Sequence, residues 1–330
     1  MLPTVRELFQ GVNAVPIQQK LRLDQVIACW LMAFALLLEG AISQLPPADL
    51  TLTYEVSVAQ IPIAQSQFGL PQISAPSYYA MDLASASLLV ASQAGELRYP
   101  ASTLKLLTAT TILNQFSASD IIVLTQADVE TNQAIKNDLF WQVGEVVSVE
   151  SLVASLLINS DNLSAQILAA HYPGGAEALY AAMAALAKNI NLASDIKISN
   201  AIGFDAQGQL LSARDLAILA KEALRQPLIR NLVATKRQLI TTKTEFSLVD
   251  HSLTNTNGLL FSDPAVKGVK TGTTELAGEV LITLTTVKNH PVLVVVMGSL
   301  DRYSDTQSLL TWLADHYRWQ SWSDVAYNEL

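Results

Sequence analysis

The chain has 330 residues, of which 50% are hydrophobic and 15% are charged, with 20 Lys and Arg residues against 29 Asp and Glu residues. This length allows one large domain or two smaller ones, and the composition excludes an intrinsically disordered protein. The net charge of -9 and the pI of about 4.9 argue against nucleic acid as a partner, and the single cysteine, Cys29, excludes an internal disulfide framework.

An apolar run without charges, residues 26–38, is the first landmark. At about 1.5 Å per residue it spans roughly 20 Å, less than the ~30 Å hydrocarbon core of a bilayer. These dimensions suit a signal-peptide core or a short membrane anchor, and a buried helix is the alternative. Lys20 and Arg22 precede the run. The positive-inside bias therefore predicts a cytoplasmic leader over 1–25, a single cell-membrane anchor or signal core over 26–42, and an extracytoplasmic location for the remainder.

The segment after the apolar run is rich in proline. We interpret residues 43–77 as a linker. Ala41-Ile42-Ser43 has the small-x-small form of a signal-peptidase site, so cleavage would give a secreted protein, whereas the spacer-like segment favours a retained anchor.

Regular structure is predicted to form one folded domain over 78–320, followed by a C-terminal tail over 321–330. Strands at both ends enclose a helical region, which predicts an α/β (α+β) chain whose single sheet is completed by distant segments around an inserted helical lobe. The predicted strands are 78–83, 87–92, 280–287 and 292–298, the last two joined by a hairpin at 288–291. The predicted helices are 102–116, 149–159, 163–170, 176–188, one from a capping box at Ser212, and 306–317.

Ser102 and Lys105 stand at the start of the first predicted helix. Residues three apart share a helix face, so the lysine can reach the serine hydroxyl. A serine is a weak nucleophile until a neighbour takes its proton, and a lysine can do so only if its pKa is lowered. Alone, this spacing also fits a capping serine and a surface lysine.

Two further tripeptides complete the pattern. Ser160-Asp161-Asn162 lies between two predicted helices, where Ser160 could relay a proton and the Asn162 amide could hold substrate or the lysine. Lys270-Thr271-Gly272 opens the strand-rich end of the chain, where a lysine and a hydroxyl suit a carboxylate and a glycine lets a substrate approach an edge strand. Each also has a purely structural reading, but Ser-x-x-Lys, Ser-Asp-Asn and Lys-Thr-Gly in this order are typical of penicillin-binding proteins and class A β-lactamases.

With these motifs the chain resembles the D-alanyl-D-alanine carboxypeptidases, the low-molecular-mass penicillin-binding proteins of peptidase family S11. The resemblance runs from about Tyr78 to Trp319 and implies a penicillin-binding-protein/β-lactamase-like transpeptidase fold, an antiparallel sheet flanked by helices with an inserted helical lobe. It extends to stretches outside the three motifs: Tyr99–Lys105, Gly144–Val149, Leu156–Asn162, Gly203–Asp205, Ser212–Ala217, Asn255–Leu260, Ala277-Gly278 and Met297–Ser299.

The resemblance implies roles for the motif residues. Ser102 would attack the carbonyl between the two terminal D-alanines of a peptidoglycan stem peptide, with Lys105 as general base and Ser160 passing the proton to the departing D-alanine. Asn162 would contact substrate, and Lys270 and Thr271 would bind the terminal carboxylate. Gly272 would let the substrate backbone approach closely. The N–H groups of Ser102 and Thr273 would form the oxyanion hole. The resemblance implies that the reaction needs no metal or cofactor. It also implies that β-lactam antibiotics act as covalent inhibitors.

The chain departs from the family pattern in the second motif, in Leu163-Ser164 after it and at Thr273, and three competing hypotheses stay open. The family commonly has Ser-Gly-Asn where this chain has Asp161, and a larger residue often stands at the position of Thr273. A class A β-lactamase is the runner-up, although the Glu-x-x-Leu-Asn segment that this class needs does not occur between Asn162 and Lys270. The remaining two hypotheses are a D,D-endopeptidase that acts on peptidoglycan cross-links and a non-catalytic protein that binds peptidoglycan.

Overall fold

The structure is a computed structural model that describes residues 60–65, 69–130, 141–192 and 196–321. The predicted leader, the predicted anchor over 26–42, residues 43–59 and 66–68 of the predicted linker and residues 322–330 of the predicted tail lie outside the described residues. Within the described ranges, no helix combines the length and the apolar character needed to cross a membrane.

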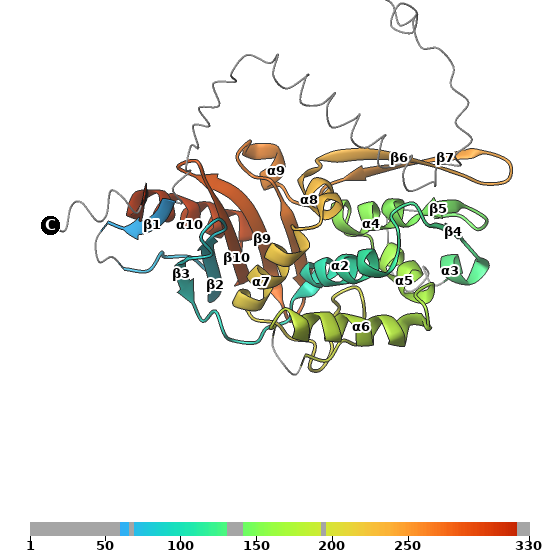
Figure 1. The fold of residues 1–330 in the computed structure, drawn as a ribbon, viewed down its shortest axis with the longest axis horizontal. Coiled ribbons are helices and arrows are strands. Elements are labelled where there is room, and N and C mark those ends of the chain that lie inside the picture. Colours follow the sequence, from blue (N-terminus) through green and yellow to red (C-terminus); the bar gives the residue numbers. More distant parts are fainter. Residues whose placement is uncertain (1–59, 66–68, 131–140, 193–195, 322–330) are drawn as a thin grey trace, which may run out of the picture. The chain divides into compact units, whose positions relative to one another are not determined.

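A five-stranded antiparallel sheet forms the centre of the fold, in the order β3-β2-β10-β9-β8 (Figure 1). Strands from both ends of the domain pair in it, as predicted, because β2 lies beside β10. The turn between β9 and β10 is Lys288-Asn289, and both residues have positive φ, which matches the twist of a two-residue hairpin. The strands are β2 (Ser77–Asp82), β3 (Leu88–Ser92), β8 (Val269–Thr274), β9 (Gly278–Val287) and β10 (His290–Ser299).

The sheet is covered on both faces. Successive side chains of a strand point to opposite faces, so one strand contributes to both cores. In β10, Leu293 and Val295 belong to the core that includes α7 (Ala213–Ala223) and the helical lobe. Val294 and Val296 belong to the second core, under α10 (Arg302–His316). This near-continuous apolar run is what a strand buried on both faces requires.

The helical lobe is built around α2 (Lys105–Gln115), which contacts α4, α6 and α7 (Figure 1). The predicted capping box at Ser212 is confirmed, since Ser212 and Asp215 bond reciprocally at the start of α7. The other helices in the described part of the chain are α3 (Gln126–Glu130), α4 (Val149–Ile158), α5 (Asn162–Ala170), α6 (Gly175–Asn189), α8 (Pro227–Ala234) and α9 (Leu259–Ser262).

Three features differ from the expectations. A second, four-stranded sheet joins β4 (Ile121–Val123), β5 (Val146–Ser148), β6 (Arg237–Lys243) and β7 (Leu248–Thr254), so the prediction of a single sheet was incomplete. Part of the predicted linker forms β1 (Gln60–Ala64), which pairs with β11 (Tyr317–Ser321). The predicted helix 102–116 begins instead as a 3-10 turn, η2 (Ala101–Leu104), which leads into α2.

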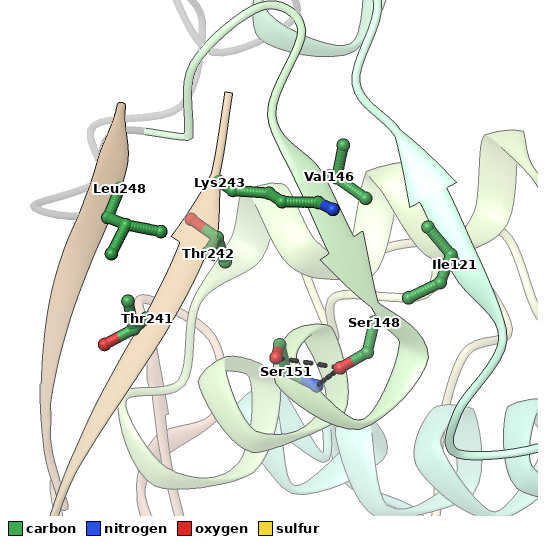
Figure 2. A pocket seen from close by; sticks show the side chains of 8 residues that line it. All are labelled: Ile121, Val146, Ser148, Ser151, Thr241, Thr242, Lys243 and Leu248. Atoms are coloured by element: carbon green, nitrogen blue, oxygen red, sulfur yellow. Dashed lines mark hydrogen bonds between the residues drawn. The ribbon is translucent and has the colours of Figure 1, made fainter. Parts of the chain in front are cut away.

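A cavity of about 290 Å³ lies in the second sheet, where β5 and β6 pair through only Val146 and Lys243 (Figure 2). Side chains from β4 to β7 and from the start of α4 line it, and the Ser148 hydroxyl accepts the Ser151 N–H at its edge. None of the residues of the three sequence motifs lines this cavity.

Candidate active site

Ser102 and Lys105 meet at the junction of η2 and α2. Side chains three residues apart eclipse one another in a 3-10 helix, so this turn places the two groups on one side. The Nζ of Lys105 lies 3.0 Å from the Oγ of Ser102. Lys105 is fully buried, whereas Ser102 is partly exposed, so the pair joins a desolvated amine to an accessible hydroxyl.

The second motif contacts the same amine, the Nζ of Lys105. Ser160 lies in the turn between α4 and α5, where it has a φ of +59°, and Asn162 is the first residue of α5. The Nζ of Lys105 donates to the Ser160 carbonyl at 2.8 Å and to the Asn162 Oδ1 at 2.5 Å, and lies 3.3 Å from the Ser160 Oγ. One amine therefore joins the first two motifs.

The third motif occupies β8, the edge strand of the central sheet. Its Gly272 packs against the turn that carries Ser102: a Cβ on Gly272 would lie 2.9 Å from the Ser102 nitrogen, a contact that a side chain does not tolerate. The hydroxyls of Thr271 and Thr256 are 2.6 Å apart. Lys270 is buried and its Nζ donates to the Thr271 carbonyl at 3.2 Å.

An open cleft of about 240 Å³ lies over these groups. Its lining comes from all three motifs and from three further residues, Thr256, Thr273 and Arg302; the motif residues are Ser102, Ser160, Thr271 and Gly272. The Arg302 guanidinium donates to the Gly272 carbonyl at 2.9 Å and to the Thr273 hydroxyl at 2.7 Å, and pairs with Glu279 at 2.9 Å. A fixed cation thus borders the cleft at the end of β8.

Both lysines are electrostatically unusual. Burial lowers the pKa of Lys105 to about 7, against the opposing effect of the Asp161 charge. Burial, together with the charges of Lys105 and Arg302, lowers the pKa of Lys270 well below its ordinary value. Lys105 therefore loses its proton near neutral pH, which an exposed lysine does not do.

The structure brings together the predicted residues Ser102, Lys105, Ser160 and Asn162, and places Thr271, Gly272 and Thr273 at the cleft. Lys270 is buried in β8 and does not line the cleft. Among the residues that the structure describes, no group of three or more His, Cys, Asp or Glu side chains could hold a metal ion.

Sequence reasoning gave no role to three residues that shape the site: Thr256, Arg302 and Gly203. Gly203 has a φ of +95°, and a Cβ on it would lie 1.9 Å from the Ala101 carbonyl oxygen. Arg302 has no local pattern that marks it, because its partners are far away in the sequence. Gly203 and Thr256 do fall in the stretches Gly203–Asp205 and Asn255–Leu260 that resemble the family, which is the one signal that pointed to them.

The antiparallel sheet, the helical lobe and the three convergent motifs define the class of active-site-serine enzymes that includes the penicillin-binding proteins and class A β-lactamases. Within this class, a family model described as D-alanyl-D-alanine carboxypeptidase matches residues 63–300. The chain belongs to this family, peptidase family S11.

Relatives with known names agree with this assignment. The chain is 30% identical over 262 residues to the D-alanyl-D-alanine carboxypeptidase DacC of Escherichia coli, a match that covers 76% of this chain and 63% of the relative. It is 30% identical over 251 residues to the D-alanyl-D-alanine endopeptidase of Escherichia coli, covering 74% of this chain and 78% of the relative.

A solved structure supports the fold. The crystal structure of a DD-transpeptidase from Streptomyces superposes with a TM-score of 0.70 at 26% sequence identity, and the match covers 74% of this chain and 99% of that chain. The architecture predicted from the sequence, an antiparallel sheet flanked by helices with an inserted helical lobe, is therefore confirmed.

Proposed function

We propose that this protein is a serine-type D-Ala-D-Ala carboxypeptidase that removes the terminal D-alanine from peptidoglycan stem peptides through an acyl-enzyme. The observation that carries the proposal is the geometry of Lys105. A neutral lysine amine has two hydrogens and one lone pair. With its hydrogens donated to the Ser160 carbonyl and the Asn162 Oδ1, the lone pair is left for the Ser102 hydroxyl at 3.0 Å.

In this mechanism Lys105 takes the proton as the Ser102 Oγ attacks the carbonyl between the two D-alanines. The tetrahedral intermediate carries an oxyanion, which the N–H groups of Ser102 and Thr273 would stabilise. Ser160, whose Oγ is 3.3 Å from Lys105, would pass the proton to the departing amine of D-alanine. Water then hydrolyses the ester and frees Ser102.

The substrate carboxylate would lie at the Arg302 end of the cleft. Thr271 and Thr273 present hydroxyls there, and the guanidinium of Arg302 is held in place by Glu279. Burial and the charges of Lys105 and Arg302 lower the pKa of Lys270, and a bound carboxylate next to this amine would favour its charged form. A free carboxylate next to the scissile bond is the feature that a carboxypeptidase must recognise.

Cleavage products distinguish the two peptidase activities. Purified muropeptides are incubated with the protein and with its Ser102→Ala variant, and the masses of the products are measured. Loss of one alanine from uncross-linked stem peptides supports a carboxypeptidase. Conversion of dimers to monomers would favour an endopeptidase, which is the activity that the name of one relative gives. No change in mass would contradict both.

β-Lactams would acylate Ser102 as covalent inhibitors in the same site. Rapid turnover of penicillin, rather than a stable adduct, would favour a β-lactamase. The carboxylate of a penicillin would occupy the place of the substrate carboxylate beside Thr271 and Arg302. Time courses of penicillin consumption therefore separate an inhibitor from a substrate.

We also propose that residues 26–38 attach the protein to the cytoplasmic membrane with the folded domain outside, where peptidoglycan lies. The support is the basic pair Lys20 and Arg22 before an apolar run. A reporter enzyme that is active only outside the cytoplasm, fused after residue 77, should be active. An inactive fusion would contradict this orientation, and a secreted product starting near Gln44 would contradict only the retained anchor.

A further inference from the structure

Asp161, the middle residue of the second motif, has its carboxylate buried among hydrogen-bond donors. Only 2% of the residue is exposed. It accepts the backbone N–H groups of Leu163 at 3.1 Å and Ser164 at 3.0 Å, which makes it the N-cap of α5. It also accepts the hydroxyls of Ser164 at 2.5 Å and Ser155 at 3.1 Å, and the indole N–H of Trp141 at 3.1 Å.

This set of donors exceeds what a helix cap needs. A capping carboxylate requires only the N–H groups of the first turn. Ser155 comes from α4, and Trp141 is a fully buried ring that precedes β5, so two other parts of the lobe also aim donors at Asp161. Backbone and indole N–H groups can only donate, and an ionised carboxylate is the side chain that can only accept. The surroundings are therefore built for a negative charge.

The position of this charge relates it to the catalytic amine. Asp161 lies between Ser160 and Asn162, and both of these accept hydrogen bonds from the Nζ of Lys105. Two other basic groups lie near the Lys105 amine: Lys270 on β8, which interacts electrostatically with Lys105, and Arg302 of α10, which interacts with Lys270. On the other side, the His251 ring of β7 lies against the Trp141 ring, with centroids 4.4 Å apart and the ring planes tilted by 48°, and bonds to Glu145.

We propose that Asp161 is a positioning residue whose buried carboxylate locks the turn that presents Ser160 and Asn162 to Lys105 and places one fixed negative charge beside the Lys105 amine. The proposal rests on the proposed function, because it assigns a role to Asp161 in the acylation of Ser102. It does not place Asp161 in contact with substrate.

The charge has a consequence for the pH dependence of acylation. Lys105 must be neutral to act as a base, so acylation rises with pH through the pKa of Lys105. Burial lowers that pKa to about 7 and the charge of Asp161 opposes the lowering. Removing the charge while keeping the fold should therefore lower the pKa of Lys105 further, and the rise in acylation should move to lower pH.

The test measures the rate of labelling by a fluorescent penicillin from pH 5 to pH 9 in the full-length protein. Asp161→Asn and Asp161→Ser remove the charge, and serine is a good N-cap residue, so this variant provides a second neutral side chain if Asn disturbs the fold. Ser155→Ala is the matched control, because it removes one hydrogen bond to the carboxylate and leaves the charge. Thermal unfolding checks each variant.

We expect the midpoint of the rise to fall by about one pH unit in the neutral variants and to stay unchanged in Ser155→Ala. A slower rate with an unchanged midpoint in both neutral variants would overturn the proposal and leave Asp161 a structural cap. An equal shift in Ser155→Ala would also overturn it. Absence of labelling in the wild-type protein would instead overturn the proposed function, on which the role of Asp161 depends.

Discussion

Gly203 packs so closely against Ala101 that a Cβ on Gly203 would lie 1.9 Å from the Ala101 carbonyl oxygen. Ala101 is fully buried, has a φ of +49° and immediately precedes Ser102. Non-glycine residues with positive φ are strained and persist where the surrounding structure holds them. The loop that carries Gly203 thus supports the backbone that presents the nucleophile.

Gly203→Ala should destabilise the protein by more than about 2 kcal/mol, because its backbone has positive φ and the added methyl group overlaps main-chain atoms. Penicillin labelling should fall even at temperatures at which the variant remains folded. The measurements are denaturant unfolding and labelling rate. Gly95→Ala is the control: nothing lies within 4 Å of its Cβ, so its stability should change by less than about 0.5 kcal/mol. Equal behaviour of the two variants would contradict the role of Gly203.

The two motif lysines should respond differently to arginine. Lys105→Arg should slow acylation of Ser102 by at least about 100-fold, since a guanidinium stays protonated and cannot act as a base. Lys270→Arg places a permanently charged side chain at the same position of β8, which suits a carboxylate, so it should retain more activity. The labelling rate of each folded variant measures this. The reverse ranking would mean that the roles of the two lysines are exchanged.

Asp305 should stabilise the fold in a pH-dependent way. Burial would raise the pKa of Asp305, but hydrogen bonds from Ser299, Ser74 and the Ala75 N–H outweigh it, so the pKa lies below its ordinary value of 3.8. A lowered pKa means that the stabilisation is fully present above the ordinary pKa and is lost as the pH falls through the lower, folded-state value.

Asp305→Asn should therefore lower the free energy of unfolding by about 2 kcal/mol at pH 7, and this difference should shrink below about pH 4. Urea unfolding from pH 2.5 to pH 7 measures it. Asp315→Asn, on the exposed side of the same helix, should change stability by less than about 0.5 kcal/mol. A difference between Asp305→Asn and the wild type that stays constant down to pH 2.5 would contradict this role of Asp305.

The elements predicted well are those with strong local signals. Strands β9 and β10 alternate between two apolar cores, and α7 begins at a capping box that can be read from Ser212 and Asp215. The second sheet was missed because β4 and β5 are three residues long and β6 exposes one face, including Leu239. The pairing of β1 with β11 was missed because its partners stand at opposite ends of the domain.

The sequence predicted the residues of the site that belong to the three motifs. The spacing of Ser102 and Lys105 predicted a shared helix face, but the 3-10 turn depends on contacts with Gly203 and Gly272, which are distant in sequence. Arg302 reaches the cleft only because α10 packs beside β9. Such residues have no local signature, since tertiary packing rather than spacing brings them to the site.

The central claim is that Ser102 forms an acyl-enzyme, and the most direct measurement is the mass of the intact protein after reaction with benzylpenicillin, followed by peptide mapping. We expect one adduct, located on Ser102, and none on Ser102→Ala. The unfolding temperature of that variant should stay close to that of the wild type, since Ser102 is partly exposed and the substitution removes its hydrogen bond to Lys105, worth about 1 kcal/mol. An adduct on another residue, or one that persists in Ser102→Ala, would contradict the assignment of Ser102 as the nucleophile.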